Sequence, residues 1–448
     1  MSNPLSINST ERKTLLLLVD IILIVSNLYL FVFYVLRGRD YDPEKFKIEI
    51  IVFGTLIYII QAYIFELYDL NKINKAKIIF PLTFFTGSLF SLTIYIGTIF
   101  TINTTVSRFF LILFLLFNPI LITLWRILAS KYMISNLSQK ETLYIYDSEK
   151  DKENRIKTIE GTNGVNGYKI SKTISLEDDS IFKNNGLKKF NAIILDVKDY
   201  NLLSREMGDF ITKSLVQGKE LQMFSTFYQS TYEALPIDLS NNNEFYEIIQ
   251  MKNKKTIYLH ILFSFFIDFF LSFFVGLFFF FITPFVYIIN IFFNKGSLFF
   301  KQKRVGKNGK EFTLYKFRSM VENAEENGAK MASQNDSRVT PFGKILRKFR
   351  IDELPQIISV INGDMKFIGP RPERRVFIDQ LIKETPFYDV RHVIKPGITG
   401  WAQVKYKYGQ NLEDSINKLE FDLFYIKNRS ITLDIRIIFK TASTILFS

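Results

Sequence analysis

Residues 257–293 read IYLHILFSFFIDFFLSFFVGLFFFFITPFVYIINIFF, and this apolar stretch decides the fold. As one straight helix it would extend about 55 Å, whereas the hydrocarbon core of a bilayer needs only about 20 helical residues. Two full spans would each be short. Asp268 lies inside the stretch, and Pro284, directly after Thr283, removes a backbone donor and bends a helix. We therefore expect a re-entrant membrane helix, with a single long tilted span as the alternative.

Upstream, residues 1–135 contain four further apolar segments. They lie at 14–36, 48–69, 79–101 and 106–128. Each approaches the ~20 residues that cross a bilayer as a helix, so we expect a four-helix transmembrane bundle. The distribution of Lys and Arg favours a cytoplasmic N-terminus by a small margin. Asp20, inside the first segment, has either a functional role or a position at the membrane interface.

The middle of the chain, residues 136–250, has the composition of a water-facing α/β domain. A helix is expected at 201–217, and short apolar stretches predict buried strands at 143–146, 192–196 and 221–224. This pattern indicates a Rossmann-like unit. The segment after its first strand, DSEKD at 147–151, has no glycine, and its acidic residues would repel a pyrophosphate. We therefore expect a structural or regulatory domain without a nucleotide-binding loop.

The composition excludes several kinds of site. The 448 residues include no Cys, which rules out disulfides, zinc–thiolate sites and cysteine nucleophiles. The net charge of +13 suits either nucleic acid or an anionic membrane surface. Because long apolar segments are present and no nucleic-acid recognition motif accompanies them, a membrane surface is the simpler explanation.

Residues 251–448 carry the chemistry. KQKRVGKNGK (301–310), followed by KFRSM (316–320), predicts a cation-rich hairpin that suits a diphosphate. Downstream, four apolar residues at helical spacing alternate with four cations between 342 and 350. We expect that helix to lie in the membrane interface, with a buried core helix as the alternative.

Two carboxylates follow directly, Asp352 and Glu353 in RIDELPQ. Nearby cations such as Arg347 favour the ionised form of a carboxylate, as a nucleophile or a metal ligand needs. In GPRPE (369–373) two prolines hold Arg371 in an extended frame that suits bidentate phosphate recognition. Cations, a carboxylate pair and a membrane anchor together indicate phosphate chemistry at a membrane surface.

At these residues the chain resembles the bacterial sugar transferase family, the monotopic phosphoglycosyl transferases, over roughly 257–448. The stretches that carry the resemblance occur in order: KQKRVGKNGKEFTLYKFRSM, DELPQ, GDMKFIGPRPE, KPGITGWAQV and LEFDLFYIKNRSITLDI. The N-terminal segments and the middle domain resemble those of larger members, which build exopolysaccharide, capsule or O-antigen repeat units. The resemblance implies a mainly α catalytic domain at 251–448.

The resemblance implies transfer of a sugar-1-phosphate from a UDP-sugar to undecaprenyl (polyprenyl) phosphate, with release of UMP. Asp352 would form a covalent sugar-phosphoryl intermediate, and Glu353 would help it to hold Mg²⁺. Phosphate oxygens would be held by Lys316, Arg318, Arg347, Arg371 and Arg391. A multi-pass protein of the bacterial inner membrane is expected, with the catalytic domain on the cytoplasmic face. Homodimerisation through the middle domain is a further expectation for members of this size.

The chain departs from the family pattern at three places. Ser264-Phe265 replaces a common Lys-Arg pair, Thr283 replaces the Ser before the helix-bending Pro, and Ser359 replaces an Asn. The two histidines, His260 and His392, are expected to be structural, with a substrate contact by His392 as the alternative.

Two rival functions stay open. A membrane glycosyltransferase would release UDP and usually carries an Asp-x-Asp-like motif on a nucleotide-binding domain, neither of which the sequence shows. A non-catalytic membrane scaffold for lipid-linked sugars would keep its function when Asp352 is replaced by Asn.

Overall fold

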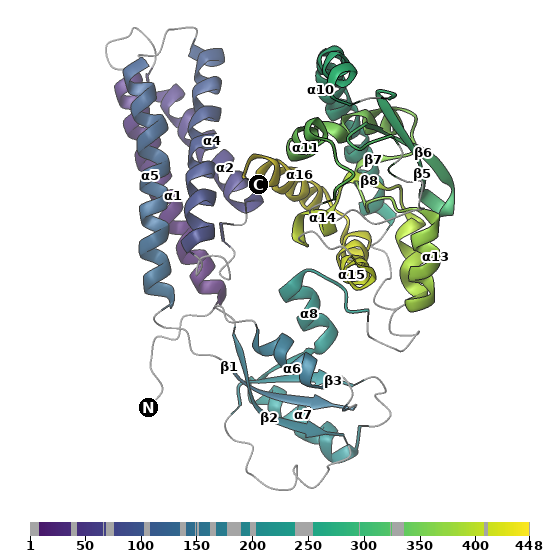
Figure 1. Cartoon of the computed structure of the whole chain (residues 1–448). Helices are drawn as coiled ribbons and strands as arrows, with labels where there is room; N and C mark the ends of the chain where they lie inside the picture. Colours follow the sequence, from purple (N-terminus) through teal and green to yellow (C-terminus); the bar gives the residue numbers. More distant parts are fainter. Residues whose placement is uncertain are drawn as a thin grey trace. The chain divides into compact units, whose positions relative to one another are not determined.

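The structure is a computed structural model, shown in Figure 1. It describes residues 9–36, 43–65, 67–68, 76–102, 108–134, 140–147, 149, 152–161, 167–176, 190–197, 203–237, 254–294, 296–322, 324, 336–406 and 411–447. The chain forms two compact units, Met1–Phe224 and Ser225–Ser448. The domain boundaries expected near 135 and 250 stay predictions.

Four long helices in the first unit form a bundle, in which α1 and α4 each pack against both α2 and α5 (Figure 1). Their bounds are α1 Ser9–Leu36, α2 Pro43–Ile64, α4 Ala76–Ile102 and α5 Arg108–Ile134. Three contain stretches long and apolar enough to cross a membrane, namely Arg12–Phe33, Ile79–Gly97 and Phe114–Lys131. The apolar part of α2, Ile48–Tyr63, is shorter. With Tyr258–Phe293 in the second unit, these helices make the chain a membrane-associated protein.

A buried ion pair joins α1 to α5 inside the bundle. Asp20 accepts hydrogen bonds from the Arg126 guanidinium, from the Tyr68 hydroxyl at 3.0 Å and from Trp125 Nε1 at 3.0 Å. Arg126 Nη1 also donates to the carbonyl oxygen of Leu67 at 3.0 Å. Asp20 therefore does not reach an interface, because its charge is neutralised in the interior of the bundle.

The first unit also contains a parallel four-stranded sheet with the strand order β2-β1-β3-β4. Its strands are β1 Lys140–Tyr146, β2 Tyr168–Ser175, β3 Ala192–Asp196 and β4 Glu220–Met223, and its helices are α6 Lys152–Glu160 and α7 Arg205–Val216. The next helix, α8 Phe224–Tyr232, belongs to the second unit except for its first residue. The predicted strands correspond to β1, β3 and β4, and the predicted helix to α7. Strand β2 was not predicted, because it is an edge strand with mostly polar, partly exposed residues and lacks an apolar run.

The described part of the second unit is mainly helical, with two two-stranded sheets and three 3₁₀ segments, and its apolar residues form two clusters. Its strands are β5 Phe299–Val305, β6 Glu311–Phe317, β7 Lys366–Ile368 and β8 Gly397–Thr399. Its α-helices are α10 Lys254–Phe293, α11 Pro341–Lys348, α12 Ile357–Ile361, α13 Arg375–Glu384, α14 Trp401–Lys405, α15 Leu412–Asn428 and α16 Ile431–Phe447. The 3₁₀ segments are η4 Lys307–Gly309, η5 Ile351–Gln356 and η6 Pro386–Val393. The cation-rich stretch forms the predicted hairpin as β5 and β6, which pair antiparallel.

One face of α10 packs along this unit while the rest of the helix is exposed. Apolar residues of that face contact the two apolar clusters of the unit; they are Ile267, Leu271, Val275, Phe279, Ile282 and Val286. Polar residues of α10 also form hydrogen bonds with other elements of the second unit. His260 Nε2 lies 2.8 Å from Asp434, Lys366 Nζ donates to Ser264 Oγ at 2.6 Å, and Asp268 accepts from the Phe367 amide at 2.9 Å. His260 is thus structural, as expected.

The helix expected at 342–350 is α11, and it divides its apolar residues between two environments. Phe342 and Leu346 pack with Val286 of α10 and Phe317 of β6. Ile345 and Phe349 stay more than half exposed. Two of its apolar residues thus pack within the unit, and Gly343 lets the helix approach the backbone of Ser319 so closely that a Cβ would lie 1.9 Å from its oxygen. The expected position of this helix in the membrane interface stays a prediction.

Candidate active site

The two candidate carboxylates lie at the start of η5, immediately after α11. Thr340 caps α11 by accepting a hydrogen bond from the Gly343 amide at 2.9 Å. The helix ends at Lys348, and Arg350 then adopts a left-handed backbone with φ of 54°. This turn reverses the chain, so that the following residues pack beneath β6 of the hairpin. Asp352 is buried with 7% of its surface exposed.

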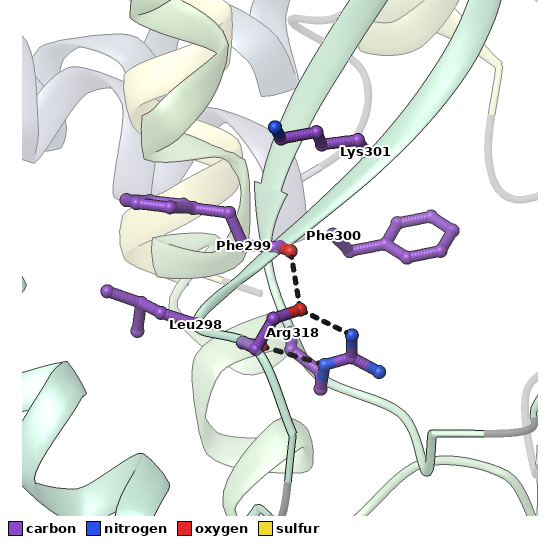
Figure 2. A pocket seen from close by; sticks show the side chains of 6 residues that line it. Leu298, Phe299, Phe300, Lys301 and Arg318 are labelled. Carbon is purple, nitrogen blue, oxygen red and sulfur yellow. Dashed lines mark hydrogen bonds between the residues drawn. The ribbon is translucent and has the colours of Figure 1, made fainter.

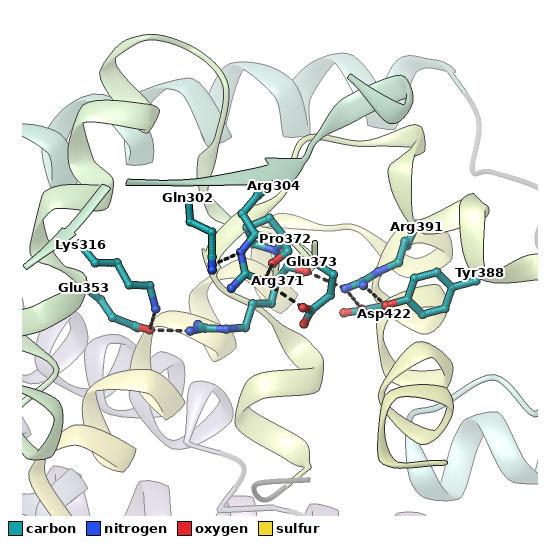
Figure 3. A network of polar contacts seen from close by, with 10 residues as sticks. All are labelled: Gln302, Arg304, Lys316, Glu353, Arg371, Pro372, Glu373, Tyr388, Arg391 and Asp422. Atoms are coloured by element: carbon teal, nitrogen blue, oxygen red, sulfur yellow. Dashed lines mark hydrogen bonds and ion pairs between the residues drawn. The ribbon is translucent and has the colours of Figure 1, made fainter. Parts of the chain in front are cut away.

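Glu353 is held by three cations from three different parts of the chain, two of which, Lys316 and Arg371, are drawn in Figure 3. Lys316 Nζ on β6 lies 3.2 Å from Glu353 Oε1, Arg371 Nη2 lies 2.5 Å from the same oxygen, and Arg350 Nη1 lies 3.6 Å from Oε2. Burial alone would raise the pKa of Glu353, but Arg371 and Lys316 outweigh it and hold that pKa well below its ordinary value. Glu353 is therefore firmly ionised.

Asp352 has the opposite electrostatic balance. Burial, reinforced by the neighbouring Glu353 charge, raises the pKa of Asp352 to about 6 against the opposing effect of Lys316, Arg347 and Arg371. Within the described part of the chain, no side chain donates a hydrogen bond to its carboxylate. A carboxylate that is weakly solvated and not engaged by a donor is the more reactive of the pair.

Close backbone packing between Gly369 and Gly397 fixes the loop that places Arg371 beside Glu353. Strands β7 and β8 approach so closely that a Cβ on Gly397 would lie 2.1 Å from the Gly369 nitrogen. The Gly397 amide also donates to the Pro370 carbonyl oxygen at 2.9 Å. The next residue in the loop, Arg371, therefore has a fixed backbone from which its guanidinium reaches Glu353.

Arg391 supports this loop from behind and does not point toward the carboxylate pair. Its Nη2 donates to the Arg371 carbonyl oxygen at 2.8 Å and to Asp422 Oδ2 at 2.8 Å, and its Nη1 bonds the Tyr388 hydroxyl (Figure 3). Its side chain is only 6% exposed. These contacts describe a positioning residue. Asp422 was not predicted as its partner, because it lies in α15 and no local sequence pattern joins it to Arg391.

A second support, also missed from sequence, is Arg304 on β5. Its Nη1 lies 3.0 Å from Glu373 and 3.1 Å from the Pro372 carbonyl oxygen. Burial lowers the pKa of Arg304, and the Glu373 charge opposes that effect. The loop that carries Arg371 is thus fixed to the hairpin on one side and to α15 on the other.

The remaining candidate cations lie apart from Glu353. Arg318 follows β6 and donates through Nε to the Ser297 carbonyl oxygen at 2.8 Å. Arg347 Nε on α11 donates to Ser319 Oγ at 2.9 Å, and its charge still acts on Asp352. The structure therefore brings Lys316, Arg371 and Arg347 around the carboxylates and places Arg318 at the end of the hairpin.

Two further residues singled out in the sequence prove structural in their contacts. Ser359, the residue in place of Asn, donates to the Thr313 carbonyl oxygen at 3.2 Å and so joins α12 to β6. His392 lies 3.1 Å from Asp389 and packs against Tyr388. Burial, aided by the Arg391 charge, lowers the pKa of His392 to about 4, so it is neutral at physiological pH.

No group of three or more His, Asp or Glu side chains that could bind a metal occurs among the described residues. Mg²⁺ needs no such group, because it keeps several waters and is commonly bound by one or two carboxylates together with substrate phosphates. The adjacent carboxylates of Asp352 and Glu353 supply that kind of donor set.

Fold and site together define a membrane-associated protein with a buried carboxylate pair in a cationic setting. Residues 259–448 match the family model for bacterial sugar transferases. A stretch of 151 residues is 42% identical to the uncharacterized sugar transferase EpsL of Bacillus subtilis, covering 34% of this chain and 71% of that protein. The chain belongs to the bacterial sugar transferase family.

Longer relatives match over a smaller share of their length. The UDP-N-acetylgalactosamine-undecaprenyl-phosphate N-acetylgalactosaminephosphotransferase of Aeromonas hydrophila is 54% identical over 151 residues, which cover 34% of this chain and 36% of the relative. The UDP-glucose:undecaprenyl-phosphate glucose-1-phosphate transferase of Escherichia coli is 43% identical over 148 residues, 33% and 32% of the two chains. The matched stretch thus spans about a third of these two relatives.

Proposed function

We propose that this protein transfers a sugar-1-phosphate from a UDP-sugar to undecaprenyl phosphate, releasing UMP through a covalent intermediate on Asp352. The observation that carries the proposal is the contrast within the carboxylate pair. Glu353 is held by three cations, whereas Asp352 is buried and accepts no hydrogen bond from a described side chain. The names of the relatives supply the substrate classes.

The reaction runs in two displacements. An oxygen of the Asp352 carboxylate attacks the β-phosphorus of the UDP-sugar, a new P–O bond forms, and the bond to the bridging oxygen breaks so that UMP leaves. An anionic oxygen of undecaprenyl phosphate then attacks the same phosphorus and restores the Asp352 carboxylate. Lys316, Arg347 and Arg371 stabilise the charge that develops on the phosphoryl oxygens.

Asp352 and Glu353 would hold Mg²⁺, which would neutralise phosphate charge in this site. Arg391 and Arg304 hold the loop that carries Arg371 and do not contact the phosphates. Arg318 lies apart from the carboxylate pair, at the end of the hairpin, where it donates to the Ser297 carbonyl oxygen and lines an open hollow (Figure 2).

The sugar is proposed to be N-acetylgalactosamine. The relatives with 54% and 51% identity carry that sugar in their names, whereas those named for glucose or galactose have 37–44% identity. UDP-glucose and UDP-galactose are the donors against which this preference is to be measured.

The membrane arrangement belongs to the proposal as well. We take α10 to be re-entrant, with both ends on the cytoplasmic face of the bacterial inner membrane. Contacts between α10 and the second unit run from His260 to Val286, about 39 Å of helix, which is more than the ~30 Å of a hydrocarbon core. A helix that crossed the membrane as a single span would be surrounded by lipid over most of that length and would not contact the rest of the second unit along it. The parallel sheet of the first unit is proposed to be Rossmann-like without a nucleotide site, and to mediate homodimerisation.

The test uses the full-length protein in membranes with Mg²⁺, undecaprenyl phosphate and a panel of UDP-sugars. We expect UMP from the wild type, fastest with UDP-N-acetylgalactosamine, and none above background from Asp352→Asn. Release of UDP would instead indicate an ordinary glycosyltransferase. Transfer by Asp352→Asn at the wild-type rate would refute the covalent route.

A further inference from the structure

Arg350 lies between α11 and the carboxylate pair, and its backbone is in the left-handed region, with φ of 54° and ψ of 21°. A residue with a side chain keeps this conformation only where its surroundings enforce it. Two backbone hydrogen bonds hold it here. The Arg350 amide donates to the Arg347 carbonyl oxygen at 3.1 Å, and the Arg350 carbonyl oxygen accepts from the Glu353 amide at 3.2 Å. Strained residues of this kind concentrate at functional sites, and this one lies two residues before Asp352.

The Arg350 side chain approaches Glu353 from a different side than the other two cations. Lys316 Nζ and Arg371 Nη2 both donate hydrogen bonds to Glu353 Oε1, at 3.2 and 2.5 Å (Figure 3). Arg350 Nη1 lies 3.6 Å from Oε2, the second oxygen of the same carboxylate. The side chain of Glu353 is 13% exposed and that of Arg350 is 33% exposed. Arg350 therefore contacts a largely buried carboxylate from its more solvent-exposed side.

The arrival of a phosphate would affect these three cations differently. Under the proposed function, Lys316 and Arg371 turn toward the phosphoryl oxygens of the donor. Both then give up part of their contact with Glu353 Oε1. Glu353 would become a buried carboxylate beside a second anion, and a buried charge without compensation is costly. Because Arg350 contacts the other oxygen, it can stay with Glu353 while the two other cations change partners.

We propose that Arg350 is a positioning residue, which holds the Glu353 carboxylate through Oε2 while the diphosphate of the donor takes Lys316 and Arg371 from Oε1. The inference rests on the proposed function and gives Arg350 no contact with the substrate. Arg350 stabilises Glu353 more in the donor complex, where the carboxylate has lost partners, than in the free protein. Loss of the Arg350 charge should therefore weaken donor binding.

The test measures donor binding without turnover. The full-length protein carries Asp352→Asn and is titrated calorimetrically, in detergent with Mg²⁺, with the UDP-sugar from which the wild type releases UMP fastest. Arg350→Asn removes the charge and keeps the turn, because asparagine tolerates the left-handed backbone. Arg350→Lys keeps the charge. The matched control is Lys348→Gln, which removes an exposed cation from the last turn of α11, two residues away.

We expect Arg350→Asn to raise the Kd for the donor roughly fivefold, equivalent to about 1 kcal/mol, without lowering the Tm. Arg350→Lys should keep the Kd within about twofold of its starting value, and so should Lys348→Gln. A double-mutant cycle with Glu353→Gln separates an action through Glu353 from a direct contact with phosphate. Once Glu353 is neutral, Arg350→Asn should change the Kd no more than Lys348→Gln does.

Several results would overturn the inference. They are an unchanged Kd or a lowered Tm in Arg350→Asn, an equal loss of affinity in Lys348→Gln, a loss in Arg350→Lys as large as in Arg350→Asn, and an effect of Arg350→Asn that persists beside Glu353→Gln. The last of these would make Arg350 a phosphate ligand. All of them leave the proposed function standing, because that function depends on UMP release by the wild type and its loss in Asp352→Asn. Absence of UMP release from the wild type with every UDP-sugar would overturn both proposals together.

Discussion

Glu233 lies in the turn after α8, and its replacement by Gln should destabilise the second unit. Its carboxylate pairs with Lys405 and, at 2.8 Å, with Arg436 Nη2. Its carbonyl oxygen accepts from Trp401 Nε1 at 2.9 Å. Its backbone has a left-handed φ of 54°, which a non-glycine residue keeps only where its surroundings enforce it. These contacts fix the segment after α8 to α14 and α16.

The pKa of this carboxylate gives the size of the effect. Burial opposes ionisation of Glu233, but Lys405 and Arg436 outweigh burial and lower its pKa from 4.5 to about 2. A difference of this size corresponds to roughly 3 kcal/mol of stability at neutral pH. For a unit of this length that equals a fall in Tm of roughly 6–12 °C.

The pH dependence has a definite sign. Because the folded-state pKa is lowered, the stabilisation is fully present above pH 4.5, the unfolded value, and is lost as the pH falls toward 2. The difference in Tm between the wild type and Glu233→Gln should therefore stay constant between pH 5 and 8. It should shrink below pH 4.5.

Fluorescence of Trp401 reports on unfolding of the region around Glu233. The chain has two Trp residues, so Trp125→Phe leaves Trp401, which is fully buried beside Glu233, as the single fluorophore. Thermal unfolding of the full-length protein in detergent would be followed by its fluorescence in this background. The control is Glu384→Gln, an exposed residue that should change stability by less than about 0.5 kcal/mol. An equal Tm for the control and Glu233→Gln would refute the reasoning.

Three further substitutions test other contacts. Gly397→Ala puts a Cβ 2.1 Å from the Gly369 nitrogen, so it should displace the Arg371 loop and lower UMP release at least tenfold; a wild-type rate would contradict this. Arg371→Lys loses the planar fork beside Glu353 and should lower UMP release roughly tenfold without changing Tm by more than about 2 °C, checked by nucleotide and melting assays. Asp20→Asn leaves Arg126 buried without its counter-charge and should cost roughly 3–5 kcal/mol in bundle stability, measured by Trp125 fluorescence in a Trp401→Phe background.

Long apolar segments were the most predictable part of the fold, because a bilayer imposes a length that can be counted in the sequence. All four N-terminal segments form helices, although α2 ends at Ile64 and not near 69. Strand β2 could not be found this way, since an edge strand with polar residues has no apolar run. Nor did the sequence show which apolar residues of α11 are buried and which are exposed. Phe342 and Ile345 are both apolar, and Phe342 is buried by contacts with Val286 of α10 and Phe317 of β6 that exist only in the tertiary fold.

The candidate site was predictable in its residue types and less so in how its charges pair. From the sequence, five cations were expected to bind phosphate oxygens alike: Lys316, Arg318, Arg347, Arg371 and Arg391. The structure separates them, because Arg391 is neutralised by Asp422, 31 residues further along the chain. No spacing rule connects residues on η6 and α15, whose contact depends on the tertiary fold.

The pairing of these charges also bears on how substrate enters. Lys316 and Arg371 both contact Glu353, so phosphate oxygens that arrive at the pair must compete with this carboxylate for the same two cations. Glu353 therefore keeps both side chains in place until a ligand arrives, which lowers the cost of ordering them at that moment. The Arg318 side chain donates to Ser297 and, among the described residues, to no carboxylate.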